Sequence, residues 1–383
     1  VTQGEGANAP LLGVISDGDI SRSQVSSPLF MIERIGRAGA VSDLTRIRTD
    51  TNSLLIDLDH QGVGPEDLIS INTEVNDHLI ARVLALVEEE LRAEPPVEPV
   101  DLAWAWMSLG SEGRGEMSIL TDQDNALVYA DPISPEEAER AEEWFRALAE
   151  RANQALADTG FELCTGEVMA RNPKWRHPLR EWKEIFRDWI LHPEAQQLME
   201  AGIFFDLRGL YGDKNLVGNL KSDIADALRK ERRFLPVLVA NALSSRPPTS
   251  GLRRLISGLG KNGANAFDLK RRGLRPLVDL ARVFAMQLGY LDSPNTADRF
   301  RYAARALPEA SKTAENALEA YAYLSEFRFK RHLKSIETAE PPENSVDPSN
   351  LNQTQQKMLQ AVFSTVAETQ DTVGHRYGLD TRN

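Results

Sequence analysis

Apolar residues recur at helical spacing near the start of the chain. Between residues 28 and 91 they fall three or four positions apart, as a helix with one face against a core requires. The repeating positions include Ile71, Val75, Leu79, Val83 and Leu86. The pattern predicts a helical hairpin or a small bundle. The stretch AEPPVEPV at residues 93–100 should end it, because proline removes a backbone donor and disfavours helix in the preceding residue.

The middle of the chain alternates short apolar runs with amphipathic stretches. Length and aromatic content predict a strand for DLAWAWMSL at residues 101–109. A helix should begin soon afterwards, where Ser134 can act as the cap, Pro135 takes the first helical position and Glu137 completes a capping box. The apolar stripe of this helix is Ala141, Trp144, Phe145, Leu148, Ala152 and Ala155, and Gly160 ends it.

Later apolar runs extend the same alternation. FELCTGEVMA at residues 161–170 and AGIFFDLRGLYGD at residues 201–213 are predicted strands, and PLREWKEIFRDWILHP at residues 178–193 is a predicted helix. Beyond about Leu216 the pattern is helical to the end of the chain. The last helix carries an apolar stripe of Leu351, Met358, Leu359, Val362, Phe363 and Val366, which is typical of core packing.

Together these elements predict an α+β fold. A small mixed β-sheet domain at residues 101–232 would be flanked by an N-terminal helical segment at residues 27–100 and a C-terminal helical bundle at residues 233–383. Residues 1–26 would be a separate segment. A length of 383 residues agrees with two or three such units.

Composition narrows the classes of function. The formal net charge of -13 argues against a nucleic-acid binder, because affinity for the phosphate backbone comes from clustered Lys and Arg. A single cysteine, Cys164, excludes a disulfide framework and fits a reducing, cytoplasmic setting. No apolar run is long enough for a membrane span. Because the sequence starts with Val1 rather than Met, we expect a fragment or a processed form.

The stretch GSEGRGEMSILTDQDNALVYAD, residues 110–131, carries the strongest chemical signal. Alternation along the strand that begins here puts Asp122 and Asp124 on one face, with Gln123 and Asn125 on the other. Two residues along a strand span about 7 Å, so two carboxylates can converge on shared cations. Mg²⁺ prefers a few carboxylate oxygens together with waters and phosphates, which fits such a pair.

The residues before the aspartates point to a phosphate ligand. Gly110 and Ser111 end the preceding strand, where glycine lets the backbone approach a ligand closely and free amides can hold an anion. Arg114 adds a fork-shaped donor suited to phosphate oxygens. We therefore expect a nucleoside triphosphate held with its metal.

Three other interpretations of the aspartates fit the sequence less well. An EF-hand needs a Glu at the twelfth position, but counting from Asp122 gives Ile133. In phosphatases of the haloacid dehalogenase type the Asp-x-Asp pair closes a strand, whereas here the apolar run ALVYA follows the pair. A plain polar turn would leave the Gly-Ser, the Arg and the spacing to chance.

Two family resemblances follow from these motifs. LLGVISDGDISRS at residues 11–23 resembles the closing segment of a CBS module, with an ordinary strand-loop-helix as the alternative. GSEGRGEMSILTDQDNALVY resembles the signature of the polymerase β-like nucleotidyltransferases, near the branch of the PII-protein uridylyltransferase and the glutamine synthetase adenylyltransferase. With GEVMARNPKW, FFDLRGLYGD and FDLKRRGLRPLVDLARVFA, it is similar to the nucleotidyltransferase and helical substrate-binding domains of bacterial CBS and cyclic-nucleotide-domain signalling proteins.

The resemblance implies roles for individual residues. Gly110 and Ser111 would contact the triphosphate, and Asp122 and Asp124 would bind two divalent cations. Asp206 in FFDLR is the best match to the superfamily's third carboxylate, with pairing to Arg208 as the alternative. The fallback candidates are Glu162 and Glu167; the family also leads us to expect a glycine near position 167.

Further residues could line the same cleft. Strand alternation would put Asp206 and Arg208 on one face, addressing one cleft. Lys270 and Arg282 could contact phosphate from the helical bundle, as Asp268 could face it, although surface salt bridges explain them equally well. Asn172 and Trp175 could line the nucleotide or acceptor pocket, although Trp175 is also a candidate for the core.

The implied activity is Mg²⁺- or Mn²⁺-dependent transfer of a nucleoside monophosphate from an NTP to a hydroxyl of a protein or a small molecule. The alternative is a regulatory module of a signalling protein that binds nucleotide without turnover. A template-directed polymerase is disfavoured by the charge balance. We expect neither nucleic acid nor membrane as a partner. N-terminal helical segments of this sort often pair, so a homodimer is also considered.

Overall fold

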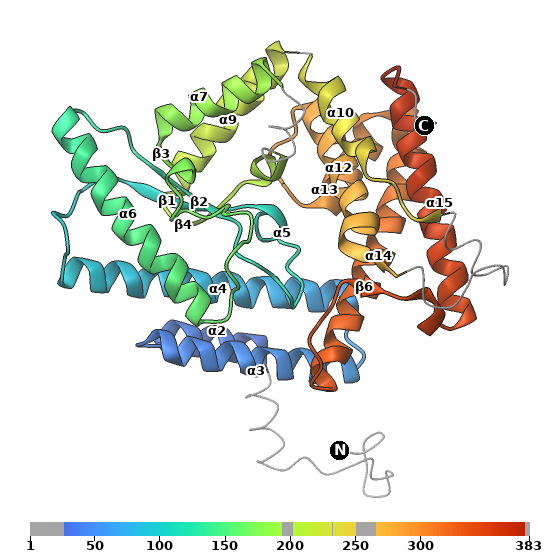
Figure 1. The fold of residues 1–383 in the computed structure, drawn as a ribbon, viewed down its shortest axis with the longest axis horizontal. Coiled ribbons are helices and arrows are strands. Elements are labelled where there is room, and N and C mark those ends of the chain that lie inside the picture. The colour runs from blue at the N-terminus through green and yellow to red at the C-terminus, as the bar shows by residue number, and fades with distance from the viewer. Residues whose placement is uncertain (1–26, 194–201, 232, 250–265, 380–383) are drawn as a thin grey trace, which may run out of the picture.

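The structure, a computed structural model, describes residues 27–193, 202–231, 233–249 and 266–379. The CBS-like stretch at residues 11–23 lies outside the described residues. In Figure 1 the N-terminal helices lie beneath a small sheet, and the C-terminal helices stack at its side. The predicted α+β fold is confirmed.

The N-terminal segment forms three helices, as its apolar spacing predicts. These are α2 (Pro28–Arg37), α3 (Val41–His60) and α4 (Pro65–Ala93). Pro28 and Pro65 each occupy a first helical position, where the missing N–H would have no helical partner in any case. The helix α4 ends at Ala93, where the proline-rich stretch begins.

The sheet contains β1 (Trp104–Ser108), β2 (Asn125–Tyr129), β3 (Arg176–Pro178) and β4 (Arg208–Gly212) in the order β3-β2-β1-β4. It is mixed, because β1 pairs antiparallel with β2 and β4 while β2 pairs parallel with β3. One face packs Trp106 and Leu127 against α4 and α6 (Pro135–Asp158). The other face packs Met107 and Val128 toward α7 (Leu179–Leu191) and α9 (Lys214–Lys230).

The helix α6 begins and ends as predicted. The Ser134 hydroxyl accepts from the Glu137 N–H at 3.2 Å, and every residue of the predicted apolar stripe is buried. The Glu137 carboxylate accepts from the Ile133 N–H rather than from that of Ser134. Gly160 follows the helix with a φ of 101°, a conformation that favours glycine.

Two of the predicted strands are corrected. Residues 161–170 form a loop in which only Glu162 makes a bridge, to Asp122, because a turn at Thr165 and Gly166 breaks the ladder. Residues 202–206 form the 3₁₀ helix η2 (Gly202–Asp206), and the strand β4 starts only at Arg208. Both faces of this segment are buried, so apolar content alone does not separate a strand from a short helix.

The C-terminal part is a helical bundle, as predicted, with one short antiparallel pair of strands, β5 and β6. Its elements are α10 (Phe234–Ser244), β5 (Phe267–Asp268), the π-helical turn η3 (Lys270–Leu274), α12 (Arg275–Leu288), α13 (Thr296–Ala306), η4 (Pro308–Ala310), α14 (Ser311–Glu337), β6 (Ser345–Val346), η5 (Pro348–Asn350) and α15 (Gln353–Arg376). The helix α12 is buried along most of its length and lies at the centre. One hydrophobic core runs from the β1 and β2 face through α9 into this bundle. In the predicted stripe of α15, Leu359, Val362, Phe363 and Val366 are buried and Met358 is exposed.

Within the described ranges, no helix is both long enough and apolar enough to cross a membrane.

Candidate active site

The last residue of β1 and the first residues of β2 and β4 lie at the same end of the sheet. Ser108, the last residue of β1, pairs with Asn125, the first residue of β2, and with Arg208, the first residue of β4. The short helix α5 (Gly110–Gly113) follows β1 directly, Asp124 immediately precedes β2, and Asp206 ends η2 just before β4. The antiparallel pairing therefore brings α5, called the glycine turn below, and these two aspartates to the same end of the domain.

The glycine turn approaches Asp124 so closely that a side chain would not fit. Gly110 has a φ of 56°, and a Cβ there would lie 2.7 Å from Asp124 Oδ2. A Cβ on Gly113 would lie 2.2 Å from the Asp206 carbonyl oxygen. The Leu109 N–H donates to the Asp124 carbonyl at 2.8 Å and fixes the turn against β2. Gly110 thus allows the turn to approach Asp124, and Gly113 allows it to approach the end of η2.

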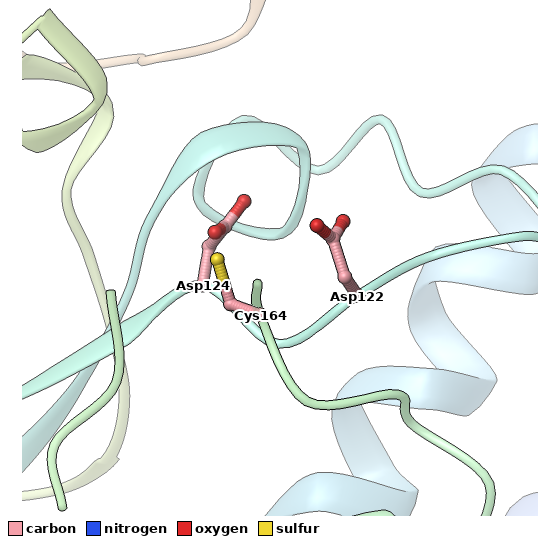
Figure 2. Close-up of side chains that lie close together, drawn as sticks. All are labelled: Asp122, Asp124 and Cys164. Carbon is pink, nitrogen blue, oxygen red and sulfur yellow. The ribbon is translucent and has the colours of Figure 1, made fainter. Parts of the chain in front are cut away.

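Asp122, Asp124 and Cys164 form a compact group (Figure 2). One ligand atom of each lies within 4.8 Å of the others. Burial, reinforced by the charge of Asp122, raises the pKa of Asp124 to about 7. Burial and the neighbouring Asp124 raise the pKa of the Cys164 thiol to about 11. Cys164 is therefore a neutral thiol that hydrogen-bonds Asp124, and the two carboxylates are the natural oxygen ligands.

The alternation predicted around the aspartates is confirmed. Ala126 and Val128 pack in the core on one side of the sheet, whereas Leu127 and Tyr129 pack in the core on the other. Asp122 and Asp124 lie on the face of Ala126 and Val128, and both remain partly accessible.

A buried amide network on the opposite face was not predicted. Asn153, on α6, donates to Gln123 Oε1 at 2.7 Å and to Asn125 Oδ1 at 3.0 Å. Gln123 Nε2 donates to the Phe161 carbonyl at 2.9 Å, and the Ala170 N–H donates to Asn125 Oδ1 at 2.8 Å. The network ties the 161–170 loop, with Cys164, to the aspartate segment. A polar Asn153 inside an apolar helix stripe was the sequence signal that could have identified it.

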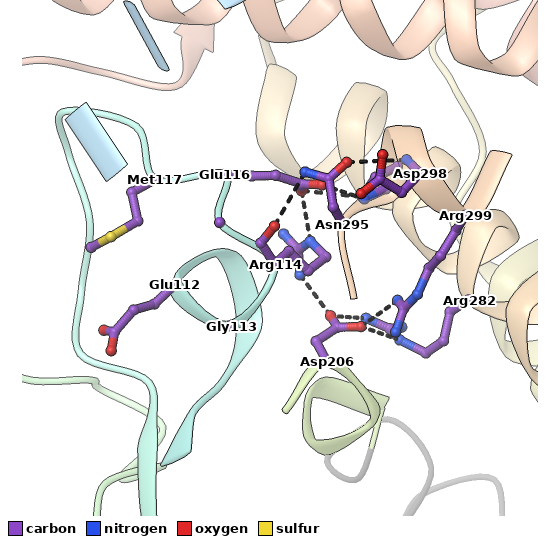
Figure 3. A network of polar contacts seen from close by, with 12 residues as sticks. Glu112, Gly113, Arg114, Glu116, Met117, Asp206, Arg282, Asn295, Asp298 and Arg299 are labelled. Carbon is purple, nitrogen blue, oxygen red and sulfur yellow. Dashed lines mark hydrogen bonds and ion pairs between the residues drawn. The ribbon is translucent and has the colours of Figure 1, made fainter. Parts of the chain in front are cut away.

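Asp206 does not join the metal-type group. It is fully buried, and its carboxylate accepts from Arg114 at 2.7 Å, from Arg282 at 2.7 Å and from Arg299 at 2.6 Å (Figure 3). Burial opposes its charge, but the three arginines prevail and hold the pKa of Asp206 well below its usual range. Both oxygens are committed, so the expectation of a third metal carboxylate and the alternative of pairing with Arg208 are corrected together.

Arg208 also differs from expectation. It forms a bidentate pair with Asp77 at 2.6 and 2.8 Å and donates to the Glu112 carbonyl at 2.8 Å and the Gly113 carbonyl at 3.2 Å. It holds the end of the glycine turn through these two carbonyl groups. It does not share a cleft with Asp206, because η2 is not a strand and side chains do not alternate across it.

Arg114 connects the glycine turn to the helical bundle. Its Nε donates to Glu116 at 2.7 Å, and its other end contacts Asp206. Glu116 accepts from the Thr296 N–H at 2.5 Å, and Asn295 Nδ2 donates to the Arg114 carbonyl at 3.2 Å. Burial lowers the pKa of Arg114, but Glu116 and Asp206 outweigh it and leave that pKa above its ordinary value. Arg114 is therefore a fixed cation beside the turn.

A cavity of about 780 Å³ lies between this end of the sheet and the helical bundle. Gly110, Ser111, Arg114 and Asp124 line its sheet side. Lys270, at the start of η3, lines its bundle side, and its Nζ lies 3.8 Å from Asp122 Oδ1.

Two further candidates for the cleft, Arg282 and Asp268, are engaged by neighbouring groups. Arg282 lines the cavity but is buried in ion pairs with Asp206 and Asp279, so it is neither a free phosphate ligand nor a surface residue. Asp268 accepts from the Arg271 N–H and begins the η3 turn.

The 167–175 loop forms one wall of the cavity. Asn172 and Trp175 both line it, and both donate to the Glu167 carbonyl, at 3.1 and 3.0 Å. Glu167 has a φ of 54°, so the turn for which the family suggests glycine is kept with a side chain present. Glu167 pairs with Arg171 and Glu162 is exposed, so neither fallback carboxylate joins the Asp122 group.

Sequence comparisons agree with this geometry. Residues 49–196 match the family model described as "Putative nucleotidyltransferase DUF294", and residues 232–377 match the one described as "Putative nucleotidyltransferase substrate binding domain". The first match contains Gly110, Asp122 and Asp124, and the second contains Lys270. The two matches support a nucleotidyltransferase family. No curated protein matches the chain significantly.

Proposed function

We propose that this chain transfers a nucleoside monophosphate from a metal-bound NTP to an acceptor hydroxyl. The reaction would take place in the cavity between the end of the sheet and the C-terminal helical bundle. The observation that carries the proposal is the contact of the Gly110 turn with Asp124, beside Asp122 and open to the cavity. The family matches support the reaction class.

The donor set fits a hard divalent cation. Asp122 and Asp124 offer carboxylate oxygens, whereas the neutral Cys164 thiol is a poor ligand for Mg²⁺. Two carboxylates leave coordination positions for waters and phosphate oxygens. A bound Mg²⁺ or Mn²⁺ would neutralise phosphate charge and polarise the reacting oxygens.

The protein's own groups would orient the nucleotide. The Gly110 and Ser111 backbone can approach the triphosphate without a side chain in between, and Arg114 is fixed beside them. Lys270 pairs with Asp122 in the structure and would be free to meet a phosphate once a cation competes for that carboxylate. Trp175 supplies an aromatic wall, packed on Phe204 with ring centroids 4.4 Å apart.

Metal-dependent binding tests the assignment. Isothermal titration with MgATP, MgCTP, MgGTP and MgUTP would compare wild type with Asp122→Asn/Asp124→Asn and with Asp101→Asn, which removes an exposed carboxylate. Wild type and Asp101→Asn should bind at least one nucleotide with Mg²⁺ dependence, and the double variant should lose that dependence. Equal magnesium-dependent binding by all three proteins would refute the metal assignment.

A regulatory module that binds nucleotide without turnover is the second candidate. It is favoured by the engagement of Asp206, because among the described residues no third carboxylate joins Asp122 and Asp124. Such a module would show the same magnesium-dependent binding. It would form no labelled product when wild type is incubated with α-labelled nucleotides and cell lysate.

A further inference from the structure

Arg328, on α14, has a buried side chain that faces the cavity. It is 8% exposed, and it lines the cavity together with Tyr321 and Ser325, which lie on the same helix face at helical spacing. Its Nε donates to Asn344 Oδ1 at 2.7 Å, a neutral partner. Across the described ranges of the chain, no carboxylate forms an ion pair with Arg328.

The other buried arginines show how unusual this is. Within the described part of the chain the buried arginines are Arg176, Arg282, Arg299 and Arg328. Arg176 pairs with Glu142 at 2.7 Å, and Arg282 and Arg299 pair with Asp206. A buried charge without a counter-ion is strongly unfavourable, so buried arginines are normally paired. Arg328 is the exception, and its guanidinium is open to the cavity.

The electrostatic surroundings agree. Burial lowers the pKa of Arg328 to about 10, and the electrostatic effects of Tyr321, Asp268 and Asp122 offset this only in part. An anion inside the cavity would supply the missing counter-charge. The planar guanidinium, held at Nε by Asn344, keeps its remaining N–H donors for a bidentate contact with phosphate or carboxylate.

We propose that Arg328 anchors an anion subsite on the bundle side of the cavity, which takes a phosphate or carboxylate group of a substrate. Two sources offer this chemistry: the terminal phosphate of the triphosphate, or an anionic group on the acceptor. The choice between these sources rests on the proposed nucleotidyl transfer, whereas anion binding itself does not. An acceptor bound here would be a small anionic molecule, with its hydroxyl directed toward the Asp122 and Asp124 side.

Calorimetric titration with two inorganic probes tests the subsite. Magnesium tripolyphosphate stands for the triphosphate, and orthophosphate is then titrated into protein saturated with it. Arg328→Gln removes the charge; Lys330→Gln, an exposed position on the same helix paired with Glu326 at 3.0 Å, is the matched control. If the nucleotide is the source, Arg328→Gln weakens tripolyphosphate binding by about tenfold or more. If the acceptor is the source, tripolyphosphate binding is unchanged and orthophosphate binding is lost in Arg328→Gln alone.

Equal binding of both probes by wild type and the two variants would overturn the subsite, as would wild type that binds neither probe. A thermal melt of the ligand-free proteins separates binding from folding. Because the charge is unpaired, Arg328→Gln should melt no lower than wild type, whereas a purely structural arginine would lower the midpoint. Arg328→Lys keeps the charge without the fork and should bind between the two; it serves if the Gln variant does not fold.

Discussion

At Gly110 the absence of a side chain sets the shape of the proposed metal site. The residue combines a φ of 56° with a Cβ position 2.7 Å from Asp124 Oδ2, so the backbone and the carboxylate share space that only glycine leaves open. The sequence predicted that Gly110 lies in a turn and that Asp122 and Asp124 share one face, because both follow from local rules for turns and strands. It did not predict Cys164 as their neighbour, because that contact is made by a separate loop.

Gly110→Ala should therefore displace Asp124. We expect a loss of stability of about 1–3 kcal/mol from the left-handed backbone and the clash, together with a clear loss of magnesium-dependent nucleotide binding. Gly218→Ala is the control, since a Cβ on this exposed residue of α9 meets nothing within 4 Å. It should be neutral or stabilising by up to about 1 kcal/mol. Urea unfolding and calorimetry measure both; similar effects of the two changes would contradict this account.

Glu112 makes a second residue-level prediction, on pH. It belongs to the short helix α5, where its side chain is buried, and burial raises its pKa from 4.5 to about 8. The Ser108 hydroxyl and Arg208 oppose this rise, whereas the charges of Asp77 and Asp124 add to it. A raised folded-state pKa means that the folded protein holds a proton that the unfolded chain releases. The associated stability is full below about pH 4.5 and declines as the pH rises through about 8.

Glu112→Gln removes this titration. Its free energy of unfolding should vary less between pH 5 and 9 than that of wild type and should exceed it at the alkaline end by an amount of the order of 1–3 kcal/mol. Glu98→Gln, which alters an exposed pair with Arg140, should follow the wild-type curve. Chemical denaturation at several pH values tests this, and parallel curves for wild type and Glu112→Gln would exclude the assigned pKa.

Among the helices and strands, the periodicity of apolar residues predicted the elements that have one regular buried face. The helix α6, its cap and its buried stripe follow from a 3.6-residue repeat, and the faces of β2 follow from a two-residue repeat. The 161–170 loop and η2 were mistaken for strands because they are apolar and short. Their conformations depend on tertiary partners: the amide network for the loop, and three arginines for η2.

The amide network should couple α6 to the proposed site. Asn153→Ala leaves Gln123 and Asn125 without their shared buried partner, and we expect a loss of about 2–3 kcal/mol of stability. Gln154→Ala, at the next and exposed position, should cost less than about 0.5 kcal/mol. If the network positions the aspartates, folded Asn153→Ala will also bind magnesium nucleotide more weakly. Wild-type affinity in that variant would mean that the network serves only the fold.

At the scale of the whole molecule, Asp206 joins the sheet to the bundle. It ends η2 and pairs with Arg114 of the glycine turn, Arg282 of α12 and Arg299 of α13. The sequence predicted Asp206 within a strand at residues 201–213. It did not predict these three partners together, which lie up to 93 residues away along the chain. A metal role would have left its oxygens open.

Asp206→Asn should thus act on stability. Removing one partner of a buried cluster of charges costs about 3–5 kcal/mol, whereas Asp226→Asn, in an exposed pair with Arg229, should cost less than about 1 kcal/mol. Urea midpoints for the two variants decide the matter. A fully stable Asp206→Asn protein that has lost only its metal binding would restore Asp206 as a metal ligand.

Transfer of a nucleoside monophosphate differs from other phosphoryl transfers in which label of the nucleotide reaches the acceptor. Purified protein, Mg²⁺ and cell lysate would be incubated with nucleoside triphosphates labelled at the α- or at the γ-phosphate. We predict that the α-label appears on an acceptor with release of pyrophosphate, that the γ-label does not, and that Asp122→Asn/Asp124→Asn forms no product. Transfer of the γ-label that depends on the added protein, or equal α-labelling by the double variant, would contradict transfer of a nucleoside monophosphate by this chain.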